Sequence, residues 1–164
     1  MSVVEARLAE MGLTLPEAPV PVGAYTPWVA AGDLLFLSGT TCYIDGGLLS
    51  VGKVGTEVSL EDAYQAARQT ALNLLAVLKQ ALGDLDRVAR VLKVNGYVNS
   101  APGFDRQPQV INGASELFLA VFGDRGVHAR TSIGVSELPG QIPVEIEMVV
   151  QIRPASPLPV DGSR

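Results

Sequence analysis

Residues Ser59 to Val98, SLEDAYQAARQTALNLLAVLKQALGDLDRVARVLKVNGYV, contain a long helix pattern followed directly by a strand pattern. Ser59 is a helix N-cap residue with Asp62 at the reciprocal capping position, and Gly83 is a helix-ending glycine. Between them, apolar residues recur at helical spacing on one stripe: Ala63, Ala67, Ala71, Leu74, Leu75, Leu78 and Leu82. We therefore predict a helix of about six turns from Leu60 to Leu82. The β-branched and mostly apolar stretch Val88–Val98 predicts a central strand that is buried on both faces.

The segments on either side complete an α+β pattern. The other predicted elements are, in chain order, a short helix over Val3–Met11, strands over Tyr25–Ala30 and Leu34–Ser38, a helix over Pro108–Phe122, and strands over Ala129–Val135 and Val144–Ile152. This order predicts a mixed β-sheet with its two main helices packed on one face. Because the opposite face still carries apolar residues, we expect a second copy of the chain to cover it.

Length and composition predict one compact domain with short additions at both ends. The chain has 164 residues, of which 48% are hydrophobic, enough to bury a core. We divide it into an N-terminal helical extension over residues 1–20, the domain over residues 21–153, and a flexible proline-rich tail over residues 154–164.

Charge and hydropathy exclude several classes of partner. The net charge of -5 argues against nucleic acid as a partner, since that affinity requires a basic surface. No apolar run approaches the length of a membrane span, and the N-terminus lacks the pattern of a secretory signal. The expected location is cytoplasmic, with no membrane partner.

Cofactor and nucleophile motifs are absent. One cysteine, Cys42, and one histidine, His128, cannot form a disulfide or a conventional zinc site within one chain. A thiolate–imidazole pair of these two residues lacks a third orienting group, and the alternative is a buried inert thiol with a surface imidazole. The glycines at 46–47 and 51–55 lack the spacing of a phosphate-binding loop and predict hairpin turns. We expect neither a metal nor another cofactor.

Two carboxylates alternate with apolar residues in the last predicted strand. Glu145 and Glu147 share one face, about 7 Å apart along the strand, while Val144, Ile146 and Met148 share the other. One interpretation is a solvated face. The other is a general acid/base carboxylate in a cleft, accompanied by a nearby cation.

Arg130 is the candidate for that cation. It lies near the start of an otherwise apolar strand, and its planar guanidinium suits bidentate contact with a carboxylate. The alternative is an edge-strand arginine that points into water. The local sequence does not distinguish the two.

Several motifs, in this order and spacing, resemble the RidA family, also known as the YjgF family. They are Val22-Gly23-Ala24-Tyr25, Leu34-Leu35-Phe36-Leu37-Ser38-Gly39, Gly83-Asp84-Leu85-Asp86-Arg87-Val88, Ala129-Arg130-Thr131-Ser132-Ile133-Gly134-Val135 with Leu138-Pro139, and Val144-Glu145-Ile146-Glu147. The similarity runs from about Pro21 to Ile152. It implies a chorismate-mutase-like α+β fold assembled as a homotrimer, with clefts between subunits.

The resemblance also implies an activity and a set of site residues. Active members of the family hydrolyse reactive enamine and imine intermediates, such as 2-aminoacrylate, to 2-keto acids and ammonia without a cofactor. By position in the motifs, Arg130 corresponds to the arginine that binds the substrate carboxylate, and Glu145 to the glutamate that helps position water. Tyr25 and Asn112 correspond to residues that line the cleft. Ser132 occupies a position where the family often has cysteine and uses its backbone carbonyl.

Residues 99–107 form a longer loop than is usual in the family, and together with the N-terminal extension they suggest a longer branch of it. Two other functions remain open. One is a non-enzymatic trimer that binds a small carboxylate metabolite through Arg130 and regulates by its occupancy. The other is an endoribonuclease, which the acidic balance and the single histidine make the weakest of the three.

Overall fold

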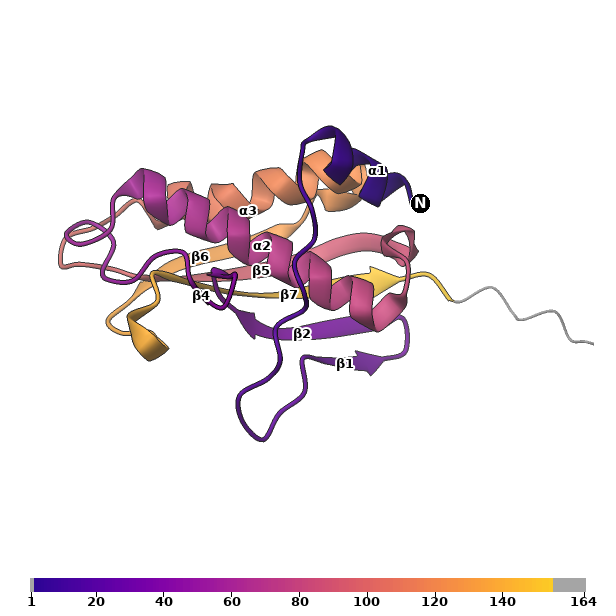
Figure 1. Ribbon diagram of the computed structural model, residues 1–164, viewed down its shortest axis with the longest axis horizontal. Helices are drawn as coiled ribbons and strands as arrows, with labels where there is room; N and C mark the ends of the chain where they lie inside the picture. The colour runs from indigo at the N-terminus through magenta and orange to yellow at the C-terminus, as the bar shows by residue number, and fades with distance from the viewer. Residues whose placement is uncertain (1, 155–164) are drawn as a thin grey trace, which may run out of the picture.

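The computed structural model describes residues 2–154 as a five-stranded sheet with two long helices on one face (Figure 1). Residues 155–164 of the predicted tail lie outside the described residues. The elements are α1 Val3–Glu10, β1 Trp28–Ala31, β2 Leu34–Thr40, β3 Tyr43–Ile44, β4 Gly47–Leu48, α2 Leu60–Leu82, β5 Val88–Asn99, α3 Gln107–Phe122, β6 Ala129–Val135 and β7 Val144–Ile152. The predicted order of the main elements is confirmed. The β3–β4 hairpin, which turns at Gly46, is a small addition to it.

The sheet is mixed, as predicted. Its strand order is β1-β2-β7-β5-β6, and every neighbouring pair is antiparallel except β5 and β6. Those two are parallel because α3 carries the chain from the end of β5 back across the sheet to the start of β6. The edge strand β6 therefore lies directly beside α3, an arrangement that matters for the site below.

The predicted bounds of α2 are confirmed, and the capping residues explain them. Ser59 Oγ accepts from the amide of Asp62 at 3.0 Å, and Gly83 ends the helix with a φ of 74°. The reciprocal contact of Asp62 is made with the Ser59 side chain rather than with its backbone amide. Its carboxylate accepts from the Ser59 hydroxyl at 2.7 Å.

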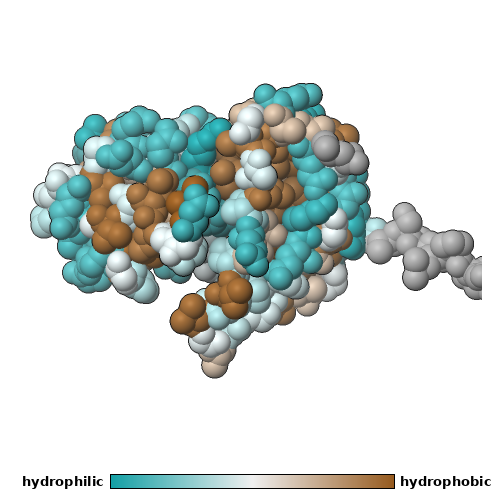
Figure 2. Space-filling model, viewed as in Figure 1, coloured by the Kyte–Doolittle hydropathy of each residue, from teal (hydrophilic) through white to brown (hydrophobic). Residues whose placement is uncertain are grey.

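Strand β1 starts three residues later than predicted. Pro27 has no amide hydrogen to give to a ladder, so pairing begins at Trp28, which lies opposite Leu37. Residues 23–25 instead form a bend before the strand. Figure 2 shows apolar atoms on the loop that projects from the lower edge of the molecule in this view. That loop contains Val20 and Val22, which are 80% and 93% exposed.

The core fills the space between the two long helices and one face of the sheet. The largest fully buried side chains include Phe118, Leu35, Leu74, Leu75, Leu78 and Ile146. Helices α2 and α3 approach closely where a Cβ on Gly113 would overlap the Tyr64 carbonyl. Among the buried polar residues, Asn73 donates to the carbonyls of Thr41 and Tyr43 at 2.7 and 2.8 Å and fastens that segment to α2.

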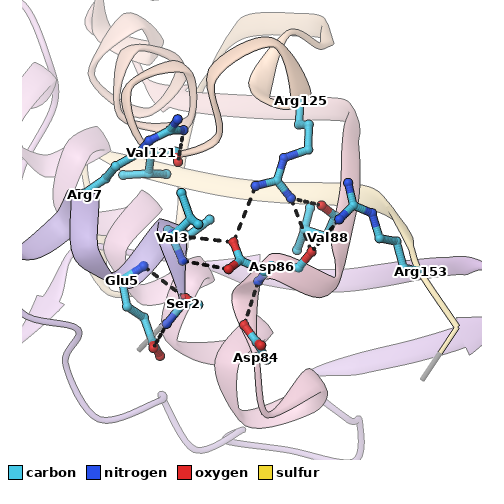
Figure 3. A network of polar contacts seen from close by, with 11 residues as sticks. Ser2, Val3, Glu5, Arg7, Asp84, Asp86, Val88, Val121, Arg125 and Arg153 are labelled. Carbon is cyan, nitrogen blue, oxygen red and sulfur yellow. Dashed lines mark hydrogen bonds and ion pairs between the residues drawn. The ribbon is translucent and has the colours of Figure 1, made fainter. Parts of the chain in front are cut away.

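Helix α1 joins the same core. Val4 and Leu8 are fully buried in it, and Figure 3 shows the polar contacts that hold the helix. Asp86 accepts from the Val3 amide at 2.6 Å, which supplies an acceptor at the helix N-terminus, and Arg125 lies 3.5 Å from the same carboxylate. Arg7 donates to the Val121 carbonyl of α3 at 2.9 Å.

The expectation that β5 is buried on both faces is wrong for a single chain. Its core face is buried, but Lys93, Asn95 and Tyr97 on the opposite face remain partly exposed. No helix within residues 2–154 covers that open face. It also carries Phe36 and Ile133, which are 44% and 45% exposed. Two exposed apolar side chains on a sheet face are consistent with burial against another protein surface.

Candidate functional site

Arg130 is held against α3 and does not extend into solvent. Its Nη1 donates to Asn112 Oδ1 at 2.8 Å and to Ser115 Oγ at 3.1 Å, and its Nη2 donates to the Pro108 carbonyl at 3.3 Å. Burial lowers the pKa of Arg130 from its ordinary value, and the group stays charged at neutral pH. A guanidinium has five N–H donors, so these contacts leave donors for a bound anion.

Ser132 lies two residues further along β6, on the same face as Arg130. Its Oγ is buried and has no hydrogen-bond partner among the described residues. Ser132 is paired with Gly96 of β5. A buried hydroxyl without a partner beside a partly exposed guanidinium is a group that a polar ligand can satisfy.

Glu145 lies on the open face of the sheet, over Gly39 of β2. A Cβ on Gly39 would overlap the Glu145 carboxylate, so only glycine leaves room for it there. Within residues 2–154, no side chain or amide donates a hydrogen bond to the side-chain carboxylate of Glu145. Burial, and then the negative charge of Glu147, raise the pKa of Glu145.

The neighbouring carboxylate has a different environment. Glu147 accepts from Asn95 Nδ2 at 2.9 Å and from Tyr97 Oη at 3.0 Å. The two glutamates on this strand face therefore differ in their hydrogen bonding. Glu147 is part of a satisfied polar network, whereas Glu145 has unused hydrogen-bonding capacity.

Tyr25, like Glu145, lies near Gly39. It is 53% exposed and lines a small surface pocket with Ser38, Gly39 and Thr40 of β2 and with Val77 of α2. Gly39 is therefore shared by the pocket that Tyr25 lines and by the seat of the Glu145 carboxylate.

Within one chain, the predicted site residues form two separate groups. Arg130 pairs with Val94, and Val94 pairs with Met148, so all three face the helices. Glu145 pairs with Tyr97 on the opposite face. Strands β6 and β7 are also separated by β5, a distance of about 10 Å between strand axes. One chain therefore does not bring Arg130 and Glu145 together, so within that chain Arg130 is not the nearby cation expected for Glu145.

The structure also places the two residues considered as a thiolate–imidazole pair. Cys42 is fully buried, 3.8 Å from the Ser50 carbonyl, as the alternative predicted. His128 is not a free surface imidazole. It lies beside α3, within hydrogen-bonding distance of Ser115 and Gly126 and edge-on to Phe118.

Two residues of the site were missed at the level of sequence. Ser115 lies three positions after Asn112 on a helix, so both residues lie on one helical face. This spacing could have identified Ser115 from the sequence. Gly39 was identified only as part of a motif. Its role could not be predicted from that motif, because the role depends on the strand beside it.

Within the described part of the chain, no group of three or more acidic, histidine or cysteine residues has the arrangement of a metal site. Within residues 2–154, no helix combines the length and the apolar character that crossing a bilayer requires.

The fold is of the chorismate-mutase-like α+β class, and comparison with known proteins agrees. A family model described as "YjgF/chorismate mutase-like, putative endoribonuclease" matches residues 5–142. The chain belongs to this YjgF/RidA family.

Named relatives and solved structures support the assignment. Protein TCP17 of Trypanosoma cruzi is 41% identical over 150 residues, which cover 91% of this chain and 94% of that protein. A 2-iminobutanoate/2-iminopropanoate deaminase of Dermatophagoides farinae is 29% identical over 140 residues, covering 85% of this chain and 94% of that protein. The crystal structure of a protein "with unknown function" from Agrobacterium tumefaciens has a TM-score of 0.87 and 43% identity, and the match covers 92% of this chain and 93% of that one.

Proposed function

We propose that this protein hydrolyses 2-imino acids, and the enamines from which they form, to 2-keto acids and ammonia. The observation that carries the proposal is Arg130, a half-buried guanidinium held by three hydrogen bonds with donors remaining for a carboxylate. The relative from Dermatophagoides farinae that is called an iminobutanoate/iminopropanoate deaminase supports the choice of substrate class.

The proposed active site lies between copies of the chain in a homotrimer. Arg130, Asn112 and Ser132 belong to one group and Glu145 and Tyr25 to the other, so a complete site needs a neighbouring copy to bring the second group to the first. The apolar side chains on the open sheet face, and the valines of the projecting loop, give that neighbour surfaces to bury.

The proposed reaction needs positioning and one proton carrier. Arg130 binds the substrate carboxylate with charge-assisted hydrogen bonds and so places the imine carbon. Glu145 takes a proton from water as the water oxygen bonds to that carbon, and the C=N double bond becomes a single bond. Glu145 returns this proton to the nitrogen, which gives a carbinolamine. The proton of the new hydroxyl group then passes through Glu145 to the amine nitrogen, the C=O double bond forms as the C–N bond breaks, and ammonia and the 2-keto acid are released. The raised pKa of Glu145 brings it closer to neutral pH, which suits a group that both accepts and returns a proton.

The test generates 2-iminopropanoate with an amino-acid oxidase and follows its capture by semicarbazide with and without the protein. We expect the wild-type protein to reduce capture, and Arg130→Lys to lose about 100-fold or more in kcat/KM, because an ammonium cannot reproduce the guanidinium fork. Arg90→Lys is the matched control, since Arg90 is an exposed arginine on β5 of the same sheet. Full activity of Arg130→Lys would disprove the assigned role, and a monomeric mass in light scattering would disprove the trimer.

The alternative is a trimer that binds a small carboxylate without turnover. The unused carboxylate of Glu145 favours catalysis over this alternative, because simple binding of an anion gains nothing from a second negative group. Glu145→Gln separates the two. Binding of a 2-keto acid should survive this change, while hydrolysis should fall sharply. Cleavage of RNA by the wild-type protein but not by Arg130→Ala would instead support the endoribonuclease description attached to the family.

A further inference from the structure

His128 has no part in the mechanism above, yet its ring is fixed by contacts on both nitrogens. Nδ1 lies 2.6 Å from the Gly126 carbonyl and Nε2 lies 3.0 Å from Ser115 Oγ. Because a carbonyl can only accept, Nδ1 carries a proton. Burial, and then the positive charge of Arg130, lower the pKa of His128 below its ordinary value of 6.5, so the ring is neutral at neutral pH. In that tautomer Nε2 is an acceptor, and the Ser115 hydroxyl must donate to it.

Ser115 connects this imidazole to the arginine. Its side chain is 8% exposed, and its single hydroxyl hydrogen is directed to His128. Its lone pairs are then available to Arg130 Nη1, which lies 3.1 Å from Ser115 Oγ. The result is a directed chain of hydrogen bonds in which Arg130 donates to Ser115, Ser115 donates to His128, and His128 donates to Gly126.

The far end of this chain is anchored in rigid backbone. Gly126 ends the short 3-10 helix Gly123–Gly126, and a Cβ there would overlap the Phe118 carbonyl of α3. The backbone of Gly126 is therefore packed against the helix too closely for any side chain. The Phe118 ring also meets the imidazole edge-on, with centroids 6.1 Å apart and planes at 81°. These contacts determine where the acceptor nitrogen of His128 lies.

We propose that His128 is a positioning residue that acts through Ser115 to fix the guanidinium of Arg130 in the orientation that binds the substrate carboxylate. This inference rests on the proposed function for its consequence in catalysis, but not for its geometry. Asn112 holds the same Nη1 from the other side at 2.8 Å, so the two contacts together determine the plane of the guanidinium. Without Ser115 and His128, Asn112 and the Pro108 carbonyl remain to hold Arg130, and its plane is less well defined.

The kinetic test is a double-mutant cycle on 2-iminopropanoate hydrolysis with Ser115→Ala, His128→Leu and the double variant. We expect Ser115→Ala to raise KM about 10-fold, the effect of losing a hydrogen bond to a charged group, with a smaller change in kcat. His128→Leu should raise KM by up to the same factor, because the Ser115 hydroxyl is then no longer held as the acceptor for Arg130. If His128 acts through Ser115, the double variant is no worse than Ser115→Ala. Additive losses, or an unchanged KM in His128→Leu, would contradict the proposal.

A conservative variant and a control distinguish the loss of this hydrogen bond from a loss of folding. In His128→Gln the side-chain oxygen can take the place of Nε2 as an acceptor for Ser115, so this variant should recover much of the KM that His128→Leu loses. His128→Gln with the KM of His128→Leu would mean that the acceptor does not matter. Ser136→Ala is the matched control for Ser115→Ala, because Ser136 is an exposed serine beyond β6.

A second readout does not need activity. Nitrogen NMR should show His128 protonated at Nδ1, and the Arg130 guanidinium should rotate more slowly about its Nε–Cζ bond in the wild type than in His128→Leu or Ser115→Ala. Equal rotation in all three proteins would overturn the inference even if the enzyme is active. Slow rotation in a wild type that does not hydrolyse imines would uphold the inference and contradict only the proposed function.

Discussion

Replacing Gly39 with alanine should separate catalysis from stability in this protein. Gly39 lies beneath the Glu145 side chain, and the added methyl carbon would lie 3.0 Å from Cδ and 3.2 Å from Cγ of Glu145 and would overlap its carboxylate oxygen. The backbone of Gly39 is not in the left-handed region, so alanine is not strained there. The carboxylate is the end of a flexible side chain and can move away.

The two expected magnitudes differ widely. To clear the methyl group, the carboxylate must move by about 1 Å, and a misplacement of that size can cost about 100-fold in rate. The free energy of unfolding should change by less than about 1 kcal/mol, because Glu145 only changes rotamer. A loss of kcat/KM of about 100-fold with nearly unchanged stability is therefore the expected result.

The assay measures kcat/KM on 2-iminopropanoate and unfolding in urea for Gly39→Ala, Glu145→Gln and the double variant. Gly47→Ala is the matched control, since a methyl group at Gly47 meets nothing within 4 Å. In the Glu145→Gln background, Gly39→Ala should have little further effect, because the group that it displaces is already inactive. Full activity of Gly39→Ala, or an equal loss in both backgrounds, would refute the role of Glu145.

Three other predictions concern stability. Asp86→Ala removes the acceptor for the Val3 amide and should lower the free energy of unfolding in urea by about 1 to 2 kcal/mol, and no change would mean that α1 docks without it. Asn73→Ala leaves two carbonyls without their donor and should cost about 2 to 3 kcal/mol, whereas Gln65→Ala on the exposed face of α2 should cost less than about 0.5 kcal/mol. For His128, the lowered pKa means that the unfolded chain binds more protons just below pH 6.5. Stability should therefore fall as the pH drops below 6.5, and His128→Gln should show a smaller fall.

Elements with a local signal were predicted well. The bounds of α2, β6 and β7 match the predictions because capping residues, helical periodicity and strand alternation act over a few neighbouring positions. The start of β1 was missed, although Pro27 is itself a local signal that should have delayed the strand to Trp28.

The burial of the two faces of β5 could not be predicted from the residues of β5 alone. A β-branched apolar run is typical of a strand that is covered on both sides, but Lys93, Asn95 and Tyr97 alternate with the buried residues. Whether their face is covered depends on what packs there, and no other part of the described chain does. The alternation within β7, by contrast, correctly placed Glu145 and Glu147 together opposite Val144 and Ile146.

The sequence alone was enough to identify the α+β class and the family resemblance, and to select the side chains that we propose bind a carboxylate and carry a proton, because each depends on residue type and short-range spacing. Which side of the sheet those side chains occupy is a tertiary property. Arg130 faces α3 and Glu145 faces away because strand register and the α3 crossover determine the facing of each strand. The contact of His128 with Ser115 likewise joins residues 13 positions apart, and it exists only because α3 packs beside β6.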